Sequence, residues 1–267
     1  MEVVGGETSA SASGGGGGGG VYELKAMPMY SEDILFCIDV DAESMVEMKT
    51  PGPDGKPLTK LDSIKKSIIL FITTKLTINP DHRFAFATLA KTTSWLKKEF
   101  SSEVEPAIAA LHGLSATTSP CGQADLTQLF RVAAHEAKKS CAQKRLFRVI
   151  LIYCRSAVIP QHQWPVSQRN FTLDVMYLHE KPGPDNCPQE VYDALVDVLE
   201  HVSELEGYIY ESAQRLARVL YRDMCVLVSH PQQRCPQDDL DIPKSLTKKA
   251  PAAESGNGED RPPVSNQ

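Results

Sequence analysis

The sequence lacks any run of apolar residues long enough to cross a membrane as a helix. Its longest runs, residues 68–72 and 149–154, are much shorter than the roughly 20 residues that a spanning helix needs. Acidic and glycine-rich residues stand at the N-terminus, where a secretory signal would place a basic flank and an apolar stretch. We therefore expect an intracellular protein with no membrane segment.

An excess of positive charge is also missing. The chain has 28 lysines and arginines against 34 aspartates and glutamates, a net charge of -6. A surface that binds nucleic acid needs lysines and arginines clustered on one face. The charge balance therefore argues against direct binding to nucleic acid.

The seven cysteines have none of the paired spacings of a structural zinc site. Their number is odd, and Cys37 and Cys154 lie inside apolar runs typical of strands. We expect reduced thiols within the protein core.

Composition divides the 267 residues into three parts. Residues 1–28 form a leader that contains the glycine run 14–20, and residues 231–267 form a polar tail with almost no aromatic side chains. Such segments offer too little apolar surface to offset their ordering entropy, so we expect both ends to be disordered. The domain is predicted over residues 29–230.

Within that domain, apolar strands alternate with amphipathic helices, which predicts an α/β fold with a mostly parallel, doubly wound sheet and helices on both faces. A hairpin is expected at one edge of the sheet. Strands are expected at 33–39, 83–89, 93–96, 146–153, 171–178 and 207–210. Helices are expected at 59–76, at 103–111, after a cap at Asp125, after a cap at Asn186, and at 212–228.

A cluster of acids follows the first of these strands. Asp39, Asp41 and Glu43 stand at alternate positions just beyond its carboxyl end. Open α/β sheets bind their ligands at this place, where the strand order reverses. The sequence therefore indicates either a metal site or the remains of one.

The order of elements resembles a von Willebrand factor A-type domain over residues 30–230. Such domains carry a magnesium site built from an Asp-x-Ser-x-Ser motif, a middle-loop threonine and a later aspartate. In this chain only Asp39 matches. Asp41 and Glu43 replace the two serines, and Arg155 stands near the position of the later aspartate.

These departures leave two interpretations of the acidic loop. Longer and more acidic side chains could hold a larger cation such as calcium, because they change both the size and the charge of the cavity. Alternatively, the acids are solvated or paired with Arg155, whose guanidinium replaces the charge of a cation. We favour the second interpretation and expect a degenerate metal site, with no cofactor.

Six segments carry a closer resemblance within this fold class: 34–39, 84–87, 93–96, 149–156, 171–179 and 229–234. In their order they resemble the von Willebrand A-like subunit of the BRISC and BRCA A deubiquitinase complexes. The resemblance implies a non-catalytic scaffold that docks on a BRE-like subunit, beside a JAMM-type zinc isopeptidase and an Abraxas-type subunit. It also implies action on lysine-sixty-three-linked ubiquitin, in DNA-damage response and ubiquitin signalling, in nucleus and cytoplasm.

The histidines agree with a non-catalytic role, since no two of them have the His-x-His spacing of a JAMM zinc centre. We therefore expect no enzyme. Two alternatives stay open: a von Willebrand A-type ubiquitin receptor of the proteasome, and a metal-dependent ligand-binding module.

Two places could serve as docking surfaces. His230, Pro231 and Arg234 follow the last predicted helix and would offer a partner an arginine fork beside a rigid turn. Trp164 lies in a polar connection, where it is expected to cover the core, with an interface anchor as the alternative.

Overall fold

A computed structural model describes residues 29–49, 51–52, 55–165 and 168–240. The expected leader, residues 1–28, and the tail from residue 241 onward lie outside the described residues.

The centre of the fold is a six-stranded sheet in the order β3-β2-β1-β4-β5-β6. All neighbouring strands pair in parallel except β2 and β3, which form the expected antiparallel hairpin at one edge. The predicted doubly wound α/β class is confirmed. The strands are β1 (Glu32–Asp39), β2 (Arg83–Leu89), β3 (Thr93–Ser101), β4 (Leu146–Tyr153), β5 (Thr172–Leu178) and β6 (Ile209–Ser212).

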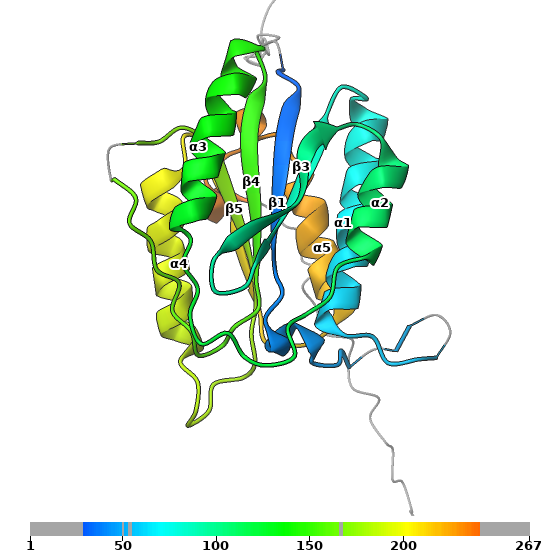
Figure 1. Ribbon diagram of the computed structural model, residues 1–267, viewed down its shortest axis with the longest axis vertical. Coiled ribbons are helices and arrows are strands. Elements are labelled where there is room, and N and C mark those ends of the chain that lie inside the picture. The colour runs from blue at the N-terminus through cyan, green and yellow to red at the C-terminus, as the bar shows by residue number, and fades with distance from the viewer. Residues whose placement is uncertain (1–28, 50, 53–54, 166–167, 241–267) are drawn as a thin grey trace, which may run out of the picture.

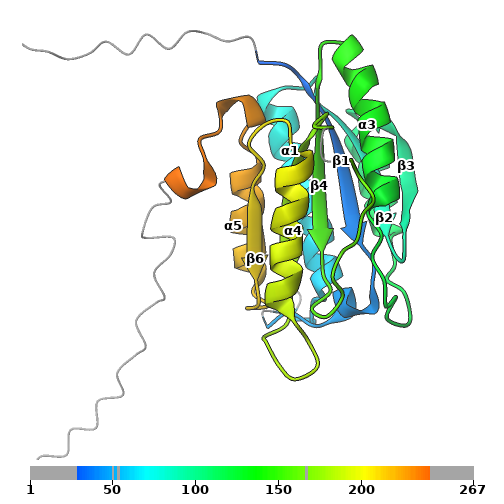
Figure 2. The same ribbon diagram turned by 90° about the vertical axis from the view of Figure 1, so that its left-hand side faces the viewer.

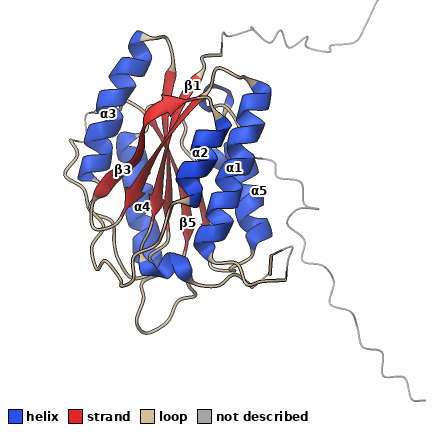
Figure 3. Cartoon of the chain, turned by 45° about the vertical axis from the view of Figure 1, so that its right-hand side comes forward, coloured by secondary structure: helices blue, strands red, loops and turns tan. Residues whose placement is uncertain are grey.

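Helices cover both faces of the sheet (Figure 1). Helices α3 and α4 pack on one face, and α1, α2 and α5 pack on the other, as the colouring of Figure 3 also shows. The helices are α1 (Lys60–Ile78), α2 (Val104–His112), α3 (Thr127–Ala142), α4 (Pro188–Val202) and α5 (Ala217–Leu227). Three short 3-10 turns are η1 (Ala42–Met45), η2 (Pro231–Gln233) and η3 (Gln237–Asp239).

Alternation along the strands produces two separate cores. In β1, Leu35 and Cys37 face α3 and α4, whereas Ile34, Phe36 and Ile38 face the other three helices. The central strands β1, β4 and β5 are buried on both faces, which explains their nearly continuous apolar runs.

Helix α1 begins with a capping box. Thr59 accepts a hydrogen bond from the backbone N–H of Asp62, and the Asp62 carboxylate accepts one from the backbone N–H of Thr59. Helix α4 begins one residue later than expected. Cys187 is its N-cap, and the Asn186 side chain instead accepts a hydrogen bond from the backbone N–H of Gly183 in the preceding loop.

The last helix also begins later than the predicted residue 212. Ser212 still belongs to β6, where it pairs with Leu178 of β5. Arg215 then adopts a positive φ of 52°, which ends any continuous right-handed helix before Ala217. Residues 213–216 therefore separate the end of β6 from the start of α5.

The predicted domain boundary at residue 230 lies too early. Residues 231–240 pack on the domain through η2 and η3, which extend beyond α5 and β6 in Figure 2. The hydroxyl of Tyr208 donates to the carbonyl of Cys235 at 2.9 Å, and Leu240 packs against the core beside α5. The domain continues through Leu240 because this segment adds buried side chains to it.

Gln237 covers part of the free edge of β6. Its side-chain oxygen accepts from the backbone N–H of Ile209 at 2.8 Å, and its amide nitrogen donates to the carbonyl of Ile209 at 2.7 Å. One side chain thus satisfies both backbone groups that Ile209 would offer to a further strand.

Candidate functional site

The predicted acidic cluster lies where the strand order reverses. Asp39 ends β1, and Arg155 follows the neighbouring strand β4 by two residues. Because parallel strands bring their carboxyl ends to the same edge, the two side chains meet although they are 116 residues apart. Their side chains are 0% and 1% exposed, respectively.

Asp39 and Arg155 form a buried ion pair. Arg155 Nη2 donates to Asp39 Oδ1 at 2.9 Å, and Arg155 Nε lies 3.1 Å from both carboxylate oxygens. The backbone N–H groups of Asp41 and Cys154 each donate to the same carboxylate at 3.0 Å. The predicted pairing of the acidic loop with Arg155 is confirmed at Asp39.

Backbone carbonyls surround the rest of the guanidinium. Arg155 Nη2 donates to the carbonyls of Leu89 and Ala90 at the end of β2, and Nη1 donates to the carbonyl of Gln123. These oxygen atoms, together with Asp39, converge on the guanidinium from three separate segments. Oxygen atoms with this convergence would suit a hard cation, and here they bind an arginine.

Asp41 and Glu43 have further hydrogen-bond partners. Asp41 caps η1 by accepting from the backbone N–H of Glu43 at 2.9 Å, and its second oxygen accepts from the backbone N–H of Cys121 at 2.7 Å. Glu43 accepts from the backbone N–H of Ser156 at 2.8 Å and lies 3.6 Å from the ammonium of Lys60. Asp41 Oδ2 also lies 3.9 Å from Arg155 Nε, so Asp39 and Asp41 both pair with the guanidinium, whereas Glu43 pairs with Lys60.

Charge and burial set the protonation of this site. Burial raises the pKa of Asp39, and the Arg155 guanidinium with the two backbone donors opposes that rise. Burial acts to lower the pKa of Arg155, but the adjacent Asp39 carboxylate holds it above its usual value.

Among residues 29–240 as described, no three or more His, Cys, Asp or Glu side chains group in a way that could hold a metal ion.

The predicted docking residues His230, Pro231 and Arg234 require a correction. His230 and Pro231 are buried, and the Arg234 side chain is 0% exposed. Arg234 Nη1 donates to Asp174 Oδ1 at 2.6 Å, and the guanidinium stacks 4.3 Å from the ring centre of Tyr208. The arginine fork is used inside the domain, so it is not available to a partner.

Arg234 belongs to a buried ionic network that the sequence analysis missed. Arg148 Nε donates to Asp174 Oδ2 at 2.6 Å and Nη1 donates to Glu32 Oε2 at 3.2 Å. Lys75 pairs with Glu32 from helix α1. The sequence did contain an indication: Arg148 and Asp174 each interrupt an otherwise apolar, doubly buried strand, and such charges require internal partners.

Trp164 covers the core, as expected. Its ring packs against the core on the α3 side, 6.3 Å from the ring of Phe130. The indole Nε1 donates to the carbonyl of Gln168 at 3.0 Å, which satisfies its one polar atom.

Comparison with curated proteins finds relatives named "BRISC and BRCA1-A complex member 1". The protein of Bos taurus is 26% identical over 221 residues, which cover 76% of this chain and 64% of that protein. Those of Xenopus tropicalis and Homo sapiens are 27% and 25% identical, with 66% and 65% of their lengths covered. The chain thus spans slightly less than two thirds of these relatives. No family model matches the sequence.

Solved structures with a similar arrangement include two domains of low identity. The SpRpn10 VWA domain is 12% identical with a TM-score of 0.44, and the match covers 77% of this chain and 99% of that one. BatB from Bacteroides thetaiotaomicron is 9% identical with a TM-score of 0.41, covering 74% and 98%. The fold class stated above is assigned from the strand order and pairing of this chain itself. No helix of the described chain is long and apolar enough to cross a membrane.

Proposed function

We propose that the chain belongs to the family of BRISC and BRCA A complex member one, and that it acts as a non-catalytic scaffold subunit. The observation that carries this proposal is the Arg155–Asp39 pair. It fills the position where a von Willebrand A-type domain would hold a metal ion, and it leaves the fold as a platform for assembly. The names of the curated relatives support the same conclusion.

The chemistry of the described side chains supports a role without catalysis. A metal-dependent reaction needs an open coordination position, whereas the oxygens around Asp39 all face a guanidinium. A thiol nucleophile needs a low pKa, whereas burial raises the pKa of Cys37 to about 12 and also raises that of Cys154.

The proposed partners are a BRE-like scaffold subunit, a JAMM-type isopeptidase and an Abraxas-type subunit. Through them the chain would act on lysine-sixty-three-linked ubiquitin, in DNA-damage response and ubiquitin signalling. The proposed locations are the nucleus and the cytoplasm.

Affinity purification with mass spectrometry tests the assignment. The tagged full chain is expressed in cells, and a BRE-like subunit with a JAMM isopeptidase is expected to co-purify in constant proportion. Recovery of proteasome subunits in their place would overturn the assignment in favour of a ubiquitin receptor.

A paired substitution separates a scaffold from a metal-dependent ligand-binding module. Asp39→Asn with Arg155→Gln removes both charges together and so leaves neither unpaired. Because neither side chain reaches the surface, co-purification of partners is expected to persist. Calorimetric titration of the unaltered protein with millimolar magnesium is expected to give no heat of binding. A binding heat that this double variant abolishes would support the metal-dependent module.

A further inference from the structure

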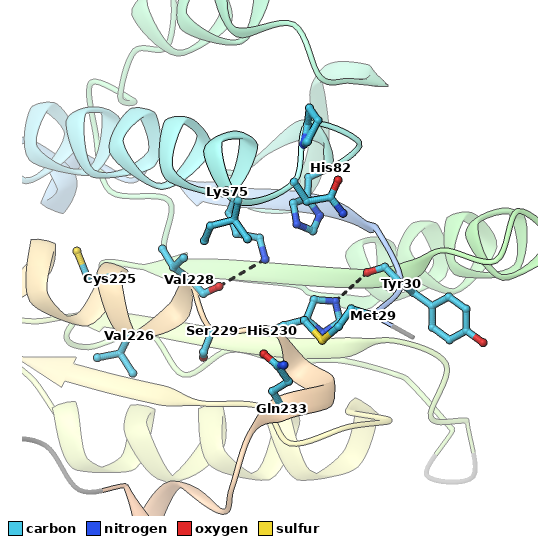
Figure 4. Close-up of a pocket in the computed structure, with 13 residues that line it drawn as sticks. Met29, Tyr30, Lys75, His82, Cys225, Val226, Val228, Ser229, His230 and Gln233 are labelled. Carbon is cyan, nitrogen blue, oxygen red and sulfur yellow. Dashed lines mark hydrogen bonds between the residues drawn. The ribbon is translucent and has the colours of Figure 1, made fainter. Parts of the chain in front are cut away.

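A groove lies at the end of the molecule opposite the Arg155 site, between the last turns of α1 and α5 (Figure 4). It encloses about 720 Å³, within the range of specific binding pockets. Its walls include Ile78 and Pro80 on the α1 side, Cys225 and Val226 on α5, and Met29 where the described chain begins. We call it the α1–α5 groove.

The rim of the α1–α5 groove exposes large apolar side chains. Met29 and Tyr30 are each 43% exposed, and Ile78 is 64% exposed. These are three of the six exposed large hydrophobic residues found in the described part of the chain. Apolar side chains gathered around a concave surface mark interaction sites or binding grooves.

The polar groups at the floor of the groove already have partners. Lys75 pairs with Glu32 and donates to the carbonyl of Val228 at 3.4 Å. His82 Nδ1 accepts from the backbone N–H of Glu32 at 2.9 Å, and His230 Nε2 lies 2.9 Å from the carbonyl oxygen of Tyr30. An occupant therefore finds mainly apolar walls and no unpaired charge to neutralise.

We propose that residues 21–28 of this same chain fold back into the α1–α5 groove. Residue 28 is bonded directly to Met29, which lines the groove, and Tyr30 is held there by a 3.2 Å hydrogen bond from its N–H to Gln232 Oε1. Fully extended, eight residues reach about 28 Å from Met29.

The sequence of residues 21–28, VYELKAMP, suits this occupancy. Four of its eight side chains are large and apolar, namely Val21, Tyr22, Leu24 and Met27. The glycine run 14–20 ends just before it, so the apolar segment is distinct from the rest of the leader. The tail from residue 241 is the other segment within the chain, but its composition is dominated by charged and small residues.

Cys225 reports on the occupancy, because it lines the groove and its thiol is free and exposed in the described structure. The full chain is alkylated with N-ethylmaleimide, and the modification of each cysteine is followed by mass spectrometry. The double substitution Leu24→Ser with Met27→Ser is expected to accelerate alkylation of Cys225 about tenfold. That factor follows for a segment tethered at about 1 mM effective concentration that binds with a Kd of about 0.1 mM.

Matched controls use the same chain. Glu23→Ser with Lys25→Ser changes the polar positions of the same segment and is expected to leave the rate at Cys225 unchanged. Cys141, which is exposed on α3 across the sheet, supplies the reference rate in every sample. All substitutions lie outside the described domain, so its thermal unfolding serves as a check that the fold is retained.

Three results would overturn the proposal. The first is an equal rate at Cys225 in the unaltered chain and in the Leu24→Ser, Met27→Ser variant. The second is a rate that falls as protein concentration rises, which would make a second copy the occupant. The third is acceleration on removal of residues 241–267 alone, which would assign the groove to the tail.

Discussion

The Arg155 side chain joins separate segments of the chain, as a bound metal ion would. Its guanidinium joins the carboxylate that ends β1 to carbonyls at the end of β2 and in the loop at Gln123. A divalent ion would contribute two charges and exchangeable water, whereas the guanidinium contributes one charge and a fixed planar set of donors. The site therefore joins three segments but has no exchangeable position.

Removal of this guanidinium is expected to be costly. Arg155→Ala leaves the Asp39 carboxylate buried without its counter-charge, so the free energy of unfolding is expected to fall by about 3–5 kcal/mol. Urea denaturation measures the change. Lys139→Ala removes a lysine that is 52% exposed and pairs with Glu136 on α3, and it is expected to cost at most about 0.5 kcal/mol. Equal costs for the two variants would show that the buried pair has no structural role.

His82 is expected to make stability depend on pH. Burial, with the nearby Lys75 ammonium, lowers its pKa to about 4 from the usual 6.5, although Glu32 acts in the opposite direction. The unfolded chain therefore binds this proton at a higher pH than the folded chain does. The stabilisation is complete above about pH 6.5 and is lost as pH falls toward 4, by about 3 kcal/mol.

Urea denaturation between pH 7 and pH 4 measures this dependence. His82→Gln keeps an acceptor for the backbone N–H of Glu32 but has no proton to gain, so its stability profile is expected to be flatter. His135→Gln, at an exposed position of α3, is expected to keep the profile of the unaltered protein. If stability changed with pH to the same extent in all three proteins, His82 would not be the source of this pH dependence.

At the scale of the elements, periodicity predicted some bounds and missed others: the strands expected at 93–96 and 207–210 are β3 (Thr93–Ser101) and β6 (Ile209–Ser212). The bounds expected for β2 and β4 match the structure, because each is an apolar run between clear breaks. Helices α4 and α5 begin later than expected. The start of α5 depends on tertiary pairing, since β6 continues through Ser212 where it pairs with β5.

The connection into β6 depends on a glycine. A Cβ atom at Gly207 would lie 2.1 Å from the carbonyl oxygen of Leu173, a backbone atom that cannot move aside without disturbing β5. Gly207→Ala is expected to lower the thermal unfolding midpoint by several degrees, since overpacking costs about 1–3 kcal/mol. Calorimetry measures the midpoint.

Gly113 is the matched control for this prediction. A Cβ atom there would meet nothing closer than 3.6 Å, and its backbone is right-handed with φ of −71°. Gly113→Ala is therefore expected to be neutral or to stabilise by about 0.4–1 kcal/mol. Similar midpoints for the two variants would contradict the crowding inferred at Gly207.

At the scale of the whole molecule, the sequence located the candidate site but not the long-range pairs. Three alternating acids after a buried strand predicted the switch-point position, and the resemblance to a von Willebrand A-type domain indicated Arg155 as their partner. The bond between Asp174 and Arg234 joins residues 60 apart, and no local pattern specifies that partner. For this reason Arg234 was mistaken for a surface group.

Arg234 attaches the C-terminal segment to the middle of the domain. Arg234→Ala is expected to accelerate hydrogen exchange in residues 231–240 and to cost about 3–5 kcal/mol, because Asp174 loses one of its two buried guanidinium partners. Exchange detected by mass spectrometry distinguishes this segment from the rest. Exchange in β3, at the opposite edge of the sheet, is expected to change least. Unchanged exchange in residues 231–240 would show that other contacts hold the segment.

The amide of Gln237 has a consequence for how copies of this molecule meet. A sheet with two open edge strands can pair edge to edge with further copies and grow into filaments. Strand β6 would be one such edge. Because Gln237 satisfies both backbone groups of Ile209, a shorter part of that edge is open to pairing with an incoming strand. At the other edge, the positive charges of Lys97 and Lys98 on β3 repel the same lysines of a second copy. The molecule is thus suited to remain dispersed at high concentration.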